Sequence, residues 1–549
     1  MSDGIPTLPI KLRISTEATR LAEKIWRSRG FPWGCLLLLV ATGVARIAAT
    51  YGVFNQVYDE PAHLASGIEY FQTGAFQFTP DHASLPRVAI GLAPYLAGLR
   101  LTGKTDVFAE GTAILHTGDY DRNLTLARVS ILPFFALVSI LLWLWTRLAF
   151  GLTAAFAATL LFTTLPPVLA HAGVATTDMA FTAGLFAAVY GFTRWIEQPD
   201  WKRGLFLGLG VALAATTKYS VLLFLPICVA VIFLLSRTDA GVRSAPPRKR
   251  LASFGVAALL AFLDVWALYR FSFGPVYHGG VPIPAFEWLR GILITREHLQ
   301  GGHPSYLLGE VRGGGWWYFF PVVLAVKTPL AFAGLVLAGL PRAFGKPPAW
   351  QRRVPFCCAT ALLLACLMST INLGVRHVLP LYPFLAMTAG AGAAVLIESR
   401  KRVAVAAGLA LLVWHLVSSA AAHPDYLAYF NELAGGHPER ILAESDIDWG
   451  QDVKRLSIAA RALHVPEIHI AYFGTADLNR YGLPPWKPLE FYRPVTGWVA
   501  ISVERLMLAS QAVAVVNHRS EGGYAWLLAH QPVARAGKSI WIYYIQPEP

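Results

Sequence analysis

Long apolar runs separated by short polar segments constrain this chain more than any other feature of its sequence. A helix that crosses a bilayer needs about 20 mainly apolar residues, because its backbone polar groups must be paired within the helix. We therefore predict a polytopic α-helical membrane protein with about 11 spans. The candidate spans lie at 32–52, 127–146, 152–170, 178–195, 204–217, 219–236, 251–270, 316–340, 354–371, 377–397 and 403–421.

The composition favours a membrane over a nucleic-acid partner. Of the 549 residues, 55% are hydrophobic and 14% are charged, whereas soluble domains carry about 25% charged residues. The net charge of +13 comes from basic residues clustered between apolar runs. The positive-inside rule explains such clusters, so we expect no nucleic-acid partner. All five cysteines lie within apolar runs, and we predict no disulfides.

The distribution of charge predicts the sidedness of the spans. Short basic segments, such as APPRKR at 245–250, alternate with segments that are acidic or weakly charged. Basic loops stay in the cytoplasm, so we place the N-terminus inside and the C-terminus outside. The short apolar stretch 88–101 has arginines at its ends, and a span there would place every later basic cluster outside. It therefore predicts an interfacial or re-entrant helix.

Three regions follow from these patterns. Residues 1–31 form a cytoplasmic segment, and 32–422 form a transmembrane domain with long external loops at 53–126 and 271–315. From about residue 424 the apolar runs become short and strand-like, as in EIHIAYFG, GWVAISV and SIWIYYIQ. A helical pattern lies at 451–464. We therefore predict a small extracytoplasmic α/β domain over 423–549.

Two adjacent carboxylates, Asp59 and Glu60, follow the first span at the membrane–water boundary. A carboxylate there can stay ionised beside a lipid-bound substrate, as a general base on a hydroxyl or as a metal ligand. The alternative is a helix N-cap before Pro61, and spacing alone leaves both interpretations open. Further along this loop, His82 is a proton carrier, a phosphate ligand or a solvated loop residue.

Charged residues also stand at the predicted external ends of later spans. Charges at membrane depth are costly and usually line a cavity or pathway. Cations at one level suit an anion such as a lipid phosphate, and snorkelling of long side chains is the alternative. The residues in question are Asp178, Lys218, Arg376 and His377.

The fourth external loop carries candidates for substrate contact. Aromatic side chains form interfacial belts in membrane proteins, and they also bind the faces of sugars. Lys327, about half-way along its span, requires a buried partner or a cavity. In the C-terminal domain, Asp446 and Asp448 form a D-x-D pattern that we interpret as a turn and a helix cap rather than a metal site. The loop candidates are His303, Tyr306, Trp316 and Trp317.

Taken in order, these motifs resemble those of the GT-C class of glycosyltransferases, which use a polyprenyl-phosphate sugar as donor. The class includes the protein O-mannosyltransferases and the lipid A aminoarabinose transferases. One segment departs from the family pattern HPPLAK, because Ala83 and Ser84 replace two prolines and Arg87 replaces a lysine. The resemblance covers about residues 50–455 and follows YDEPAHLASGIEYFQTG, DHASLPRV, TTDMA, LAATTKYS, GHPSYLLGE, GWWYFFPVVLAVKTPL, NLGVRHVLPLYPF, HPDYLAYFNELAGG and SDIDWGQD.

The resemblance implies roles for the candidate residues. Asp59 would take the proton from the acceptor hydroxyl, Glu60 would position it or help bind the acceptor or a metal, and Asp178 would be a second acid near the site. The cations would neutralise the phosphate of the lipid leaving group. No cofactor is assigned, and a divalent metal at Asp59 and Glu60 stays open. The donor phosphate ligands would be Lys218, Arg376, His377 and Arg87, and the candidates for substrate binding are His82, His303, Tyr306, Trp316 and Trp317.

The predicted function is transfer of a sugar from a polyprenyl-phosphate donor to an acceptor hydroxyl, with inversion. The acceptor is a protein, a lipid or a glycan, and the site faces outward from a bacterial plasma membrane. A transporter or lipid flippase is the alternative, although such proteins usually show internal repeats and binding groups at the bilayer midplane. A membrane-anchored binding protein is a third hypothesis, but a single span would suffice as its anchor.

Overall fold

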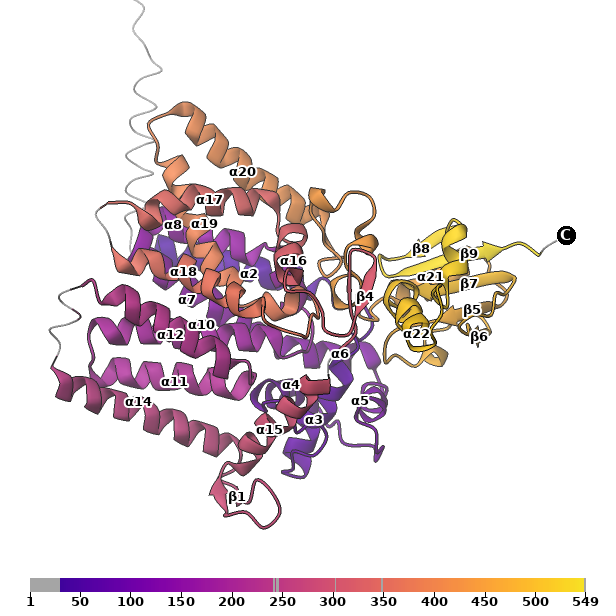
Figure 1. Cartoon of the computed structure of the whole chain (residues 1–549), viewed down its shortest axis with the longest axis horizontal. Coiled ribbons are helices and arrows are strands. Elements are labelled where there is room, and N and C mark those ends of the chain that lie inside the picture. The colour runs from indigo at the N-terminus through magenta and orange to yellow at the C-terminus, as the bar shows by residue number, and fades with distance from the viewer. Residues whose placement is uncertain (1–29, 240–241, 243–245, 302, 347–348, 548–549) are drawn as a thin grey trace, which may run out of the picture.

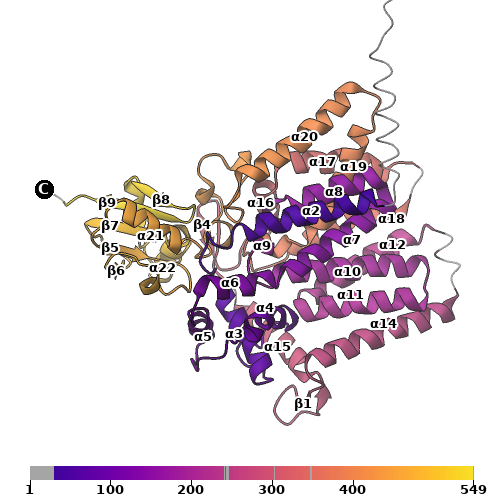
Figure 2. The ribbon, with the colours of Figure 1, turned by 180° about the vertical axis from the view of Figure 1, so that it is seen from behind.

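A computed structural model of the chain describes residues 30–239, 242, 246–301, 303–346 and 349–547. The predicted cytoplasmic segment 1–31 therefore lies outside the described residues except for its last two. The described chain forms a bundle of helices with a small β-sheet beyond one end (Figures 1 and 2). The predicted fold class, a helical membrane protein with a small C-terminal α/β region, is confirmed. The domain limits and the sidedness stay predictions.

Each predicted span contains a helix or a bent pair of helices. Among the described residues, four segments are long and apolar enough to cross a membrane, or up to six if each of two bent pairs is one span. The number of 11 spans therefore stays a prediction. The four are α2 (Phe31–Ala48), Tyr120–Phe150 with α6 (Tyr120–Val129) and α7 (Leu132–Phe150), α14 (Pro247–Leu268) and α20 (Arg402–Ala421). The bent pairs are α8 (Leu152–Thr163) with α9 (Pro166–Ala172) at 60°, and α16 (Phe319–Lys327) with α17 (Leu330–Phe344) at 106°. The other predicted spans contain α10 (Asp178–Glu197), α11 (Trp201–Thr217), α12 (Val221–Ser236), α18 (Trp350–Cys366) and α19 (Leu381–Ile397).

Proline accounts for both bends. Leu165 is extended before Pro166, and Thr328 is extended before Pro329. The residue before a proline is disfavoured in the helical region, and proline itself has no backbone N–H to donate. The second break leaves carbonyls unpaired within the helix, and the side-chain amide of Asn431 donates to two of them, the oxygens of Ala325 and Thr328, both at 2.6 Å.

Small residues let the central helices pack closely. A Cβ added to Gly210 of α11 would stand 2.9 Å from the Cα of Ala188 in α10. Such close approach is typical of small residues between membrane helices. The tight α10–α11 pair fixes the level of Asp178, at the start of α10, relative to Lys218, directly after α11.

The loops predicted to be external fold at the end of the bundle that faces the sheet (Figures 1 and 2). The stretch 88–101, predicted to be interfacial, contains α4 (Leu85–Leu96), which is not among the segments long enough to span. The first loop also contains α3 (Glu60–Gln72), α5 (Val107–Leu115) and α6. The fourth loop contains β1 (Phe273–Gly274), β2 (Ile283–Pro284), α15 (Phe286–Gly301), β3 (Ser305–Leu307) and β4 (Glu310–Arg312).

The C-terminal region is built on a five-stranded sheet with the order β6-β5-β7-β9-β8. β5 pairs in parallel with β6 and β7, and β9 pairs antiparallel with β7 and β8. The three strand-like runs of the sequence form β5, β7 and β9, whereas β6 and β8 gave no sequence signal. The elements are α21 (Val453–Ala462), β5 (Ile468–Ala471), β6 (Trp486–Pro488), β7 (Gly497–Ser502), α22 (Ser510–Val516), β8 (Ala534–Ala536) and β9 (Ile540–Ile545).

Candidate active site

Asp59, directly before α3, forms an ion pair with Arg376 of the short helix η1 (Val375–Val378). The carboxylate Oδ2 lies 2.7 Å from Nη1 of Arg376. Asp59 occupies the N-cap position of α3, but its side chain makes no capping hydrogen bond. With 30% of the side chain exposed, the carboxylate of Asp59 faces Arg376 and remains accessible.

Asp178 and Lys218 form a second ion pair, with Nζ of Lys218 2.9 Å from Oδ1 of Asp178. Asp178 is buried, whereas 25% of the Lys218 side chain is exposed. Burial lowers the pKa of Arg376, but Asp59, Glu444 and Asp178 raise it, and the net shift is upward. The two ion pairs therefore act on one another, and we call Asp59, Asp178, Lys218 and Arg376 the charged cluster.

Glu60 is buried and fully engaged in hydrogen bonds. Its Oε1 accepts from Arg128 Nε at 2.7 Å and from Ala175 N at 2.8 Å. Its Oε2 accepts from Arg128 Nη2 and from Val57 N, both at 2.8 Å. Glu60 thus joins α3 to α6 and to the segment before α10, and this arrangement fits the predicted positioning role better than acceptor or metal binding. Among the described residues, no group of three or more His, Cys, Asp or Glu side chains could hold a metal ion.

His377 directly follows Arg376 in η1 and therefore lies beside the charged cluster. Its ring stacks on Phe320 with the ring centres 6.4 Å apart. The role of His377 as a ligand of the donor phosphate stays a prediction.

Two histidines of the first loop face one another next to the cluster. The rings of His63 and His82 are 5.7 Å apart, and His82 Nδ1 lies 3.1 Å from Asp81 Oδ1. His82 is 41% exposed, as a substrate contact or proton carrier requires. His63, which sequence reasoning did not single out, is buried, and burial lowers its pKa to about 3.

The surroundings of Arg87 are not those expected of a phosphate ligand. Its guanidinium is buried and donates to the carbonyls of Thr79, His82 and Ala83 and to the Thr79 hydroxyl. All of these acceptors belong to its own loop. Ala83 and Ser84 stand where the family segment has two prolines, and in this chain the hydrogen bonds of Arg87 join residues 79, 82 and 83.

The four candidate residues of the fourth loop lie in different environments. Tyr306 is buried and its hydroxyl donates to the Glu439 carbonyl at 3.0 Å, within the core of the C-terminal region. Trp316 is also buried, whereas Trp317 is 68% exposed. His303 is partly exposed, and Nδ1 of its ring lies 2.7 Å from the carbonyl oxygen of Pro304.

Sequence reasoning missed three residues that shape the site. Arg128 was assigned to the start of a span, Glu444 followed no recognised motif, and Trp449 was one letter of SDIDWGQD. Arg128 is almost completely buried against Glu60. For Arg128, the one usable sequence signal was the position of an arginine at the start of an apolar run, next to an acidic loop.

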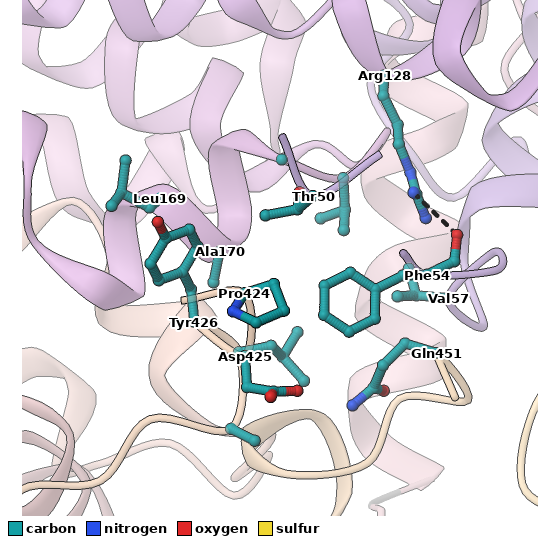
Figure 3. Close-up of a pocket in the computed structure, with 14 residues that line it drawn as sticks. Thr50, Phe54, Val57, Arg128, Leu169, Ala170, Pro424, Asp425, Tyr426 and Gln451 are labelled. Carbon is teal, nitrogen blue, oxygen red and sulfur yellow. Dashed lines mark hydrogen bonds between the residues drawn. The ribbon is translucent and has the colours of Figure 1, made fainter. Parts of the chain in front are cut away.

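A small pocket is lined in part by Arg128 (Figure 3). Phe54 and Pro424 face each other across it, and Arg128 Nη1 at its rim donates to the Phe54 carbonyl at 3.4 Å. Its volume of about 30 Å³ holds one or two water molecules and no sugar. Since its lining is mostly apolar, we place the chemistry at the charged cluster instead.

Solved structures share this fold. The oligosaccharyltransferase of Archaeoglobus fulgidus in its apo form has a TM-score of 0.53 and 10% identity, over 91% of this chain and 72% of that chain. AglB from Archaeoglobus fulgidus, in complex with an inhibitory peptide and a dolichol-phosphate, has a TM-score of 0.51 and 10% identity, over 87% and 70% of the two chains. The chain therefore has the GT-C fold of membrane glycosyltransferases, as its motifs predicted.

Within this class, residues 121–269 match the family model described as dolichyl-phosphate-mannose-protein mannosyltransferase. The matched segment contains Asp178 and Lys218 and ends before Arg376. ArnT from Cupriavidus metallidurans bound to undecaprenyl phosphate is also similar, with a TM-score of 0.49 and 14% identity over 94% of this chain and 98% of that chain. A search of curated proteins found no match.

Proposed function

We propose that this chain is a membrane glycosyltransferase that moves a sugar from a polyprenyl-phosphate donor to an acceptor hydroxyl. One observation carries the proposal: side chains from four distant parts of the chain form a cluster of two carboxylates and two cations. The GT-C fold, the family match over 121–269 and the dolichol-phosphate bound by AglB support the same reaction class. An extracytoplasmic site in a bacterial plasma membrane is part of the proposal.

Asp59 is the general base in this mechanism. Its carboxylate is the more exposed of the two in the cluster, so an acceptor hydroxyl can reach it. As the hydroxyl oxygen bonds to the anomeric carbon, its proton passes to Asp59. A positioned general base contributes roughly 10²–10⁴-fold to the rate.

Arg376 and Lys218 stabilise the leaving phosphate. The bond between the anomeric carbon and the phosphate oxygen breaks, and the electron pair stays on the lipid phosphate. Arg376 uses Nη1 for Asp59 and Nε for the Leu373 carbonyl, which leaves Nη2 for a phosphate oxygen. Lys218 has two further N–H donors besides the one that binds Asp178. Attack opposite the phosphate inverts the anomeric configuration.

Asp178 and Glu60 have supporting roles in the proposal. Asp178 holds the Lys218 ammonium through the 2.9 Å contact, and Glu60 holds the loop before Asp59 through Val57 N. His82 and His303 are the proposed contacts to the sugar or the acceptor, and His377 is a proposed hydrogen-bond partner of the phosphate. The sugar and the acceptor class, whether protein, lipid or glycan, are left to the assay.

Lys327, the charged residue half-way along its predicted span, bears on the transporter alternative. Lys327 is buried, and its ammonium donates to the carbonyls of Leu427 and Asp446, both at 2.7 Å. It also lies 4.2 Å from the centre of the Phe430 ring. These contacts give Lys327 a structural task at the break between α16 and α17, with no transported ion required.

The proposal is tested by incubating purified protein with radiolabelled polyprenyl-phosphate sugars and a membrane extract. We expect label to move to an acceptor with the wild-type protein. We expect Asp59→Asn to reduce transfer by roughly 10²–10⁴-fold, because the amide cannot take the proton.

Asp119→Asn is the matched control for this assay. Asp119 lies in the same loop and caps α6 by accepting from Arg122 N, a task that asparagine also performs. Transfer should be unchanged in this variant. Full transfer by Asp59→Asn would remove the proposed base, and no transfer from any donor by the wild-type protein would favour a transporter.

A further inference from the structure

Residues 445–453, which we call the clamp segment, connect the C-terminal region to the charged cluster. On one side the clamp segment holds the backbone that leads to Asp59. Tyr58 N donates to the Trp449 carbonyl at 2.9 Å, and the Val57 side chain packs against the Trp449 ring. The two residues directly before Asp59 are therefore fixed by one tryptophan.

On the other side the clamp segment holds the turn that carries Arg376. Val375 N donates to Asp446 Oδ1 at 3.1 Å. The guanidinium carbon of Arg376 lies 4.5 Å from the centre of the Trp449 ring. A cation over an indole face is held by the ring quadrupole, so the ring restricts the orientations that the guanidinium can take.

The aspartates around Trp449 fix the backbone from which it projects. Asp448 accepts from Gly450 N at 3.0 Å and from Glu504 N at 3.1 Å. Asp446 binds Val375 N, as above. The Asp448–Gly450 bond agrees with the predicted turn, whereas neither Asp446 nor Asp448 forms the predicted helix cap, because α21 begins directly after Asp452. Asp446 and Asp448, which precede Trp449, therefore fix its backbone.

We propose that Trp449 is a positioning residue for the Asp59–Arg376 pair. Its ring sets the orientation of the Arg376 guanidinium, and its carbonyl fixes the position of the loop that ends at Asp59. It also packs with Val174, four residues before Asp178, so it reaches three of the segments that carry the cluster. The inference rests on the proposed function, because it takes this pair as the place of reaction.

Two substitutions of Trp449 separate this role from simple filling of space. Trp449→Phe keeps an aromatic face for Arg376. Trp449→Met introduces an apolar side chain with a volume similar to that of phenylalanine but without a ring. If the ring only fills space, the two variants behave alike. If the ring positions Arg376, methionine is the worse replacement.

Hydrogen–deuterium exchange of the full-length protein measures the positioning without any substrate. In Trp449→Met we expect peptides that cover 54–60 and 373–379 to exchange about tenfold faster than in Trp449→Phe, because the loops lose their common support. Trp541→Met is the matched control, since Trp541 carries a comparable contact with Arg535, 4.7 Å from its ring, within the sheet. Equal exchange in the Phe and Met variants, or the same change in Trp541→Met, would overturn the proposal.

Transfer of labelled sugar provides the second measurement. We expect Trp449→Met to lower kcat/KM for the donor by about tenfold or more, and Trp449→Phe by less, because Arg376 acts on the donor phosphate. In an Arg376→Ala background, Trp449→Met should add little, and additive losses would contradict action through Arg376. If the wild-type protein transfers no sugar, that result counts against the proposed function. The exchange measurement still decides the proposal about Trp449 in that case.

Discussion

Glu444 places a third carboxyl group beside Asp59 and Arg376. Its backbone lies in the left-handed region with φ of 56°, a conformation that costs a non-glycine residue of order 1 kcal/mol or more. Burial is the largest effect on its pKa and raises it, Arg376 lowers it, and Asp446 and Asp59 raise it again. The net result is a pKa of about 7 against an ordinary value of 4.5.

This shift predicts a pH dependence that belongs to one residue. Because the pKa of Glu444 is raised in the folded state, its contribution to stability is present below about pH 4.5 and is lost as pH rises towards 7. Above pH 7 the folded protein holds an unfavourable buried carboxylate, which Glu444→Gln removes. We expect Glu444→Gln to raise the midpoint of thermal unfolding relative to wild type at pH 8 and to have little effect at pH 4.5.

The exposed Glu490 is the control for the Glu444 measurement, because 55% of its side chain is exposed and its Gln variant should not change the pH profile. A Glu444→Gln difference that is the same at both pH values would show that Glu444 is already ionised throughout, or that its side chain acts by shape alone.

At the scale of elements, the loop before α4 depends on Arg87. The guanidinium forms a fork of hydrogen bonds to loop carbonyls that a lysine cannot reproduce. We expect Arg87→Lys to destabilise the protein by about 1–3 kcal/mol, since it leaves buried carbonyls without donors. Thermal unfolding measures this change, and Arg100→Lys, at an exposed arginine of the same loop, should have little effect.

The opposite pattern would restore the phosphate role predicted for Arg87. Unchanged stability of Arg87→Lys, combined with a changed KM for the donor, would mean that the side chain leaves its loop to bind substrate.

The sequence predicted helices more reliably than it predicted contacts. Apolar runs with about 20 residues mark helices because period and length are local properties, and prolines at 166 and 329 mark the bends for the same reason. The residues of the charged cluster could also be predicted from the sequence, because charges at the ends of spans are energetically costly and therefore stand out. The pairing of these residues could not be predicted. Asp59 and Arg376 are separated by 317 residues, and no local sequence pattern indicates a contact over such a separation.

Residues that act by tertiary approach were missed for that reason. Arg128 reads as the basic end of a span until Glu60, 68 residues away, is seen against it. Ligand contact by Arg87 and Tyr306 stays a prediction. The structure shows both side chains donating to carbonyls of the protein, which no local pattern around them indicated.

At the scale of the whole molecule, Asn55 joins the membrane part to the C-terminal region. It is fully buried, its Nδ2 donates to the Gly450 carbonyl, and its Oδ1 accepts from Val453 N, both at 2.7 Å. We expect Asn55→Ala to destabilise the protein by about 1–3 kcal/mol, because buried backbone groups lose their partners. Limited proteolysis should then cut more readily between 423 and 453.

Asn123→Ala is the matched control for the junction. Asn123 is also buried, but its amide binds the carbonyls of Leu115 and Thr117 within the first loop. It should lower stability without opening the junction to protease. Equal cutting in the two variants would mean that Asn55 is one ordinary buried amide among others.

The place of the clamp segment in the chain has a consequence for how the protein matures. A ribosome makes Asp59, Asp178, Lys218 and Arg376 before it makes residues 445–453, yet the contacts that orient Arg376 come from this later segment. A nascent chain therefore lacks these supports of the Asp59–Arg376 pair until residues 445–453 are synthesised and dock. Under the proposed function, we expect a chain truncated before residue 445 to transfer no sugar even when it inserts correctly.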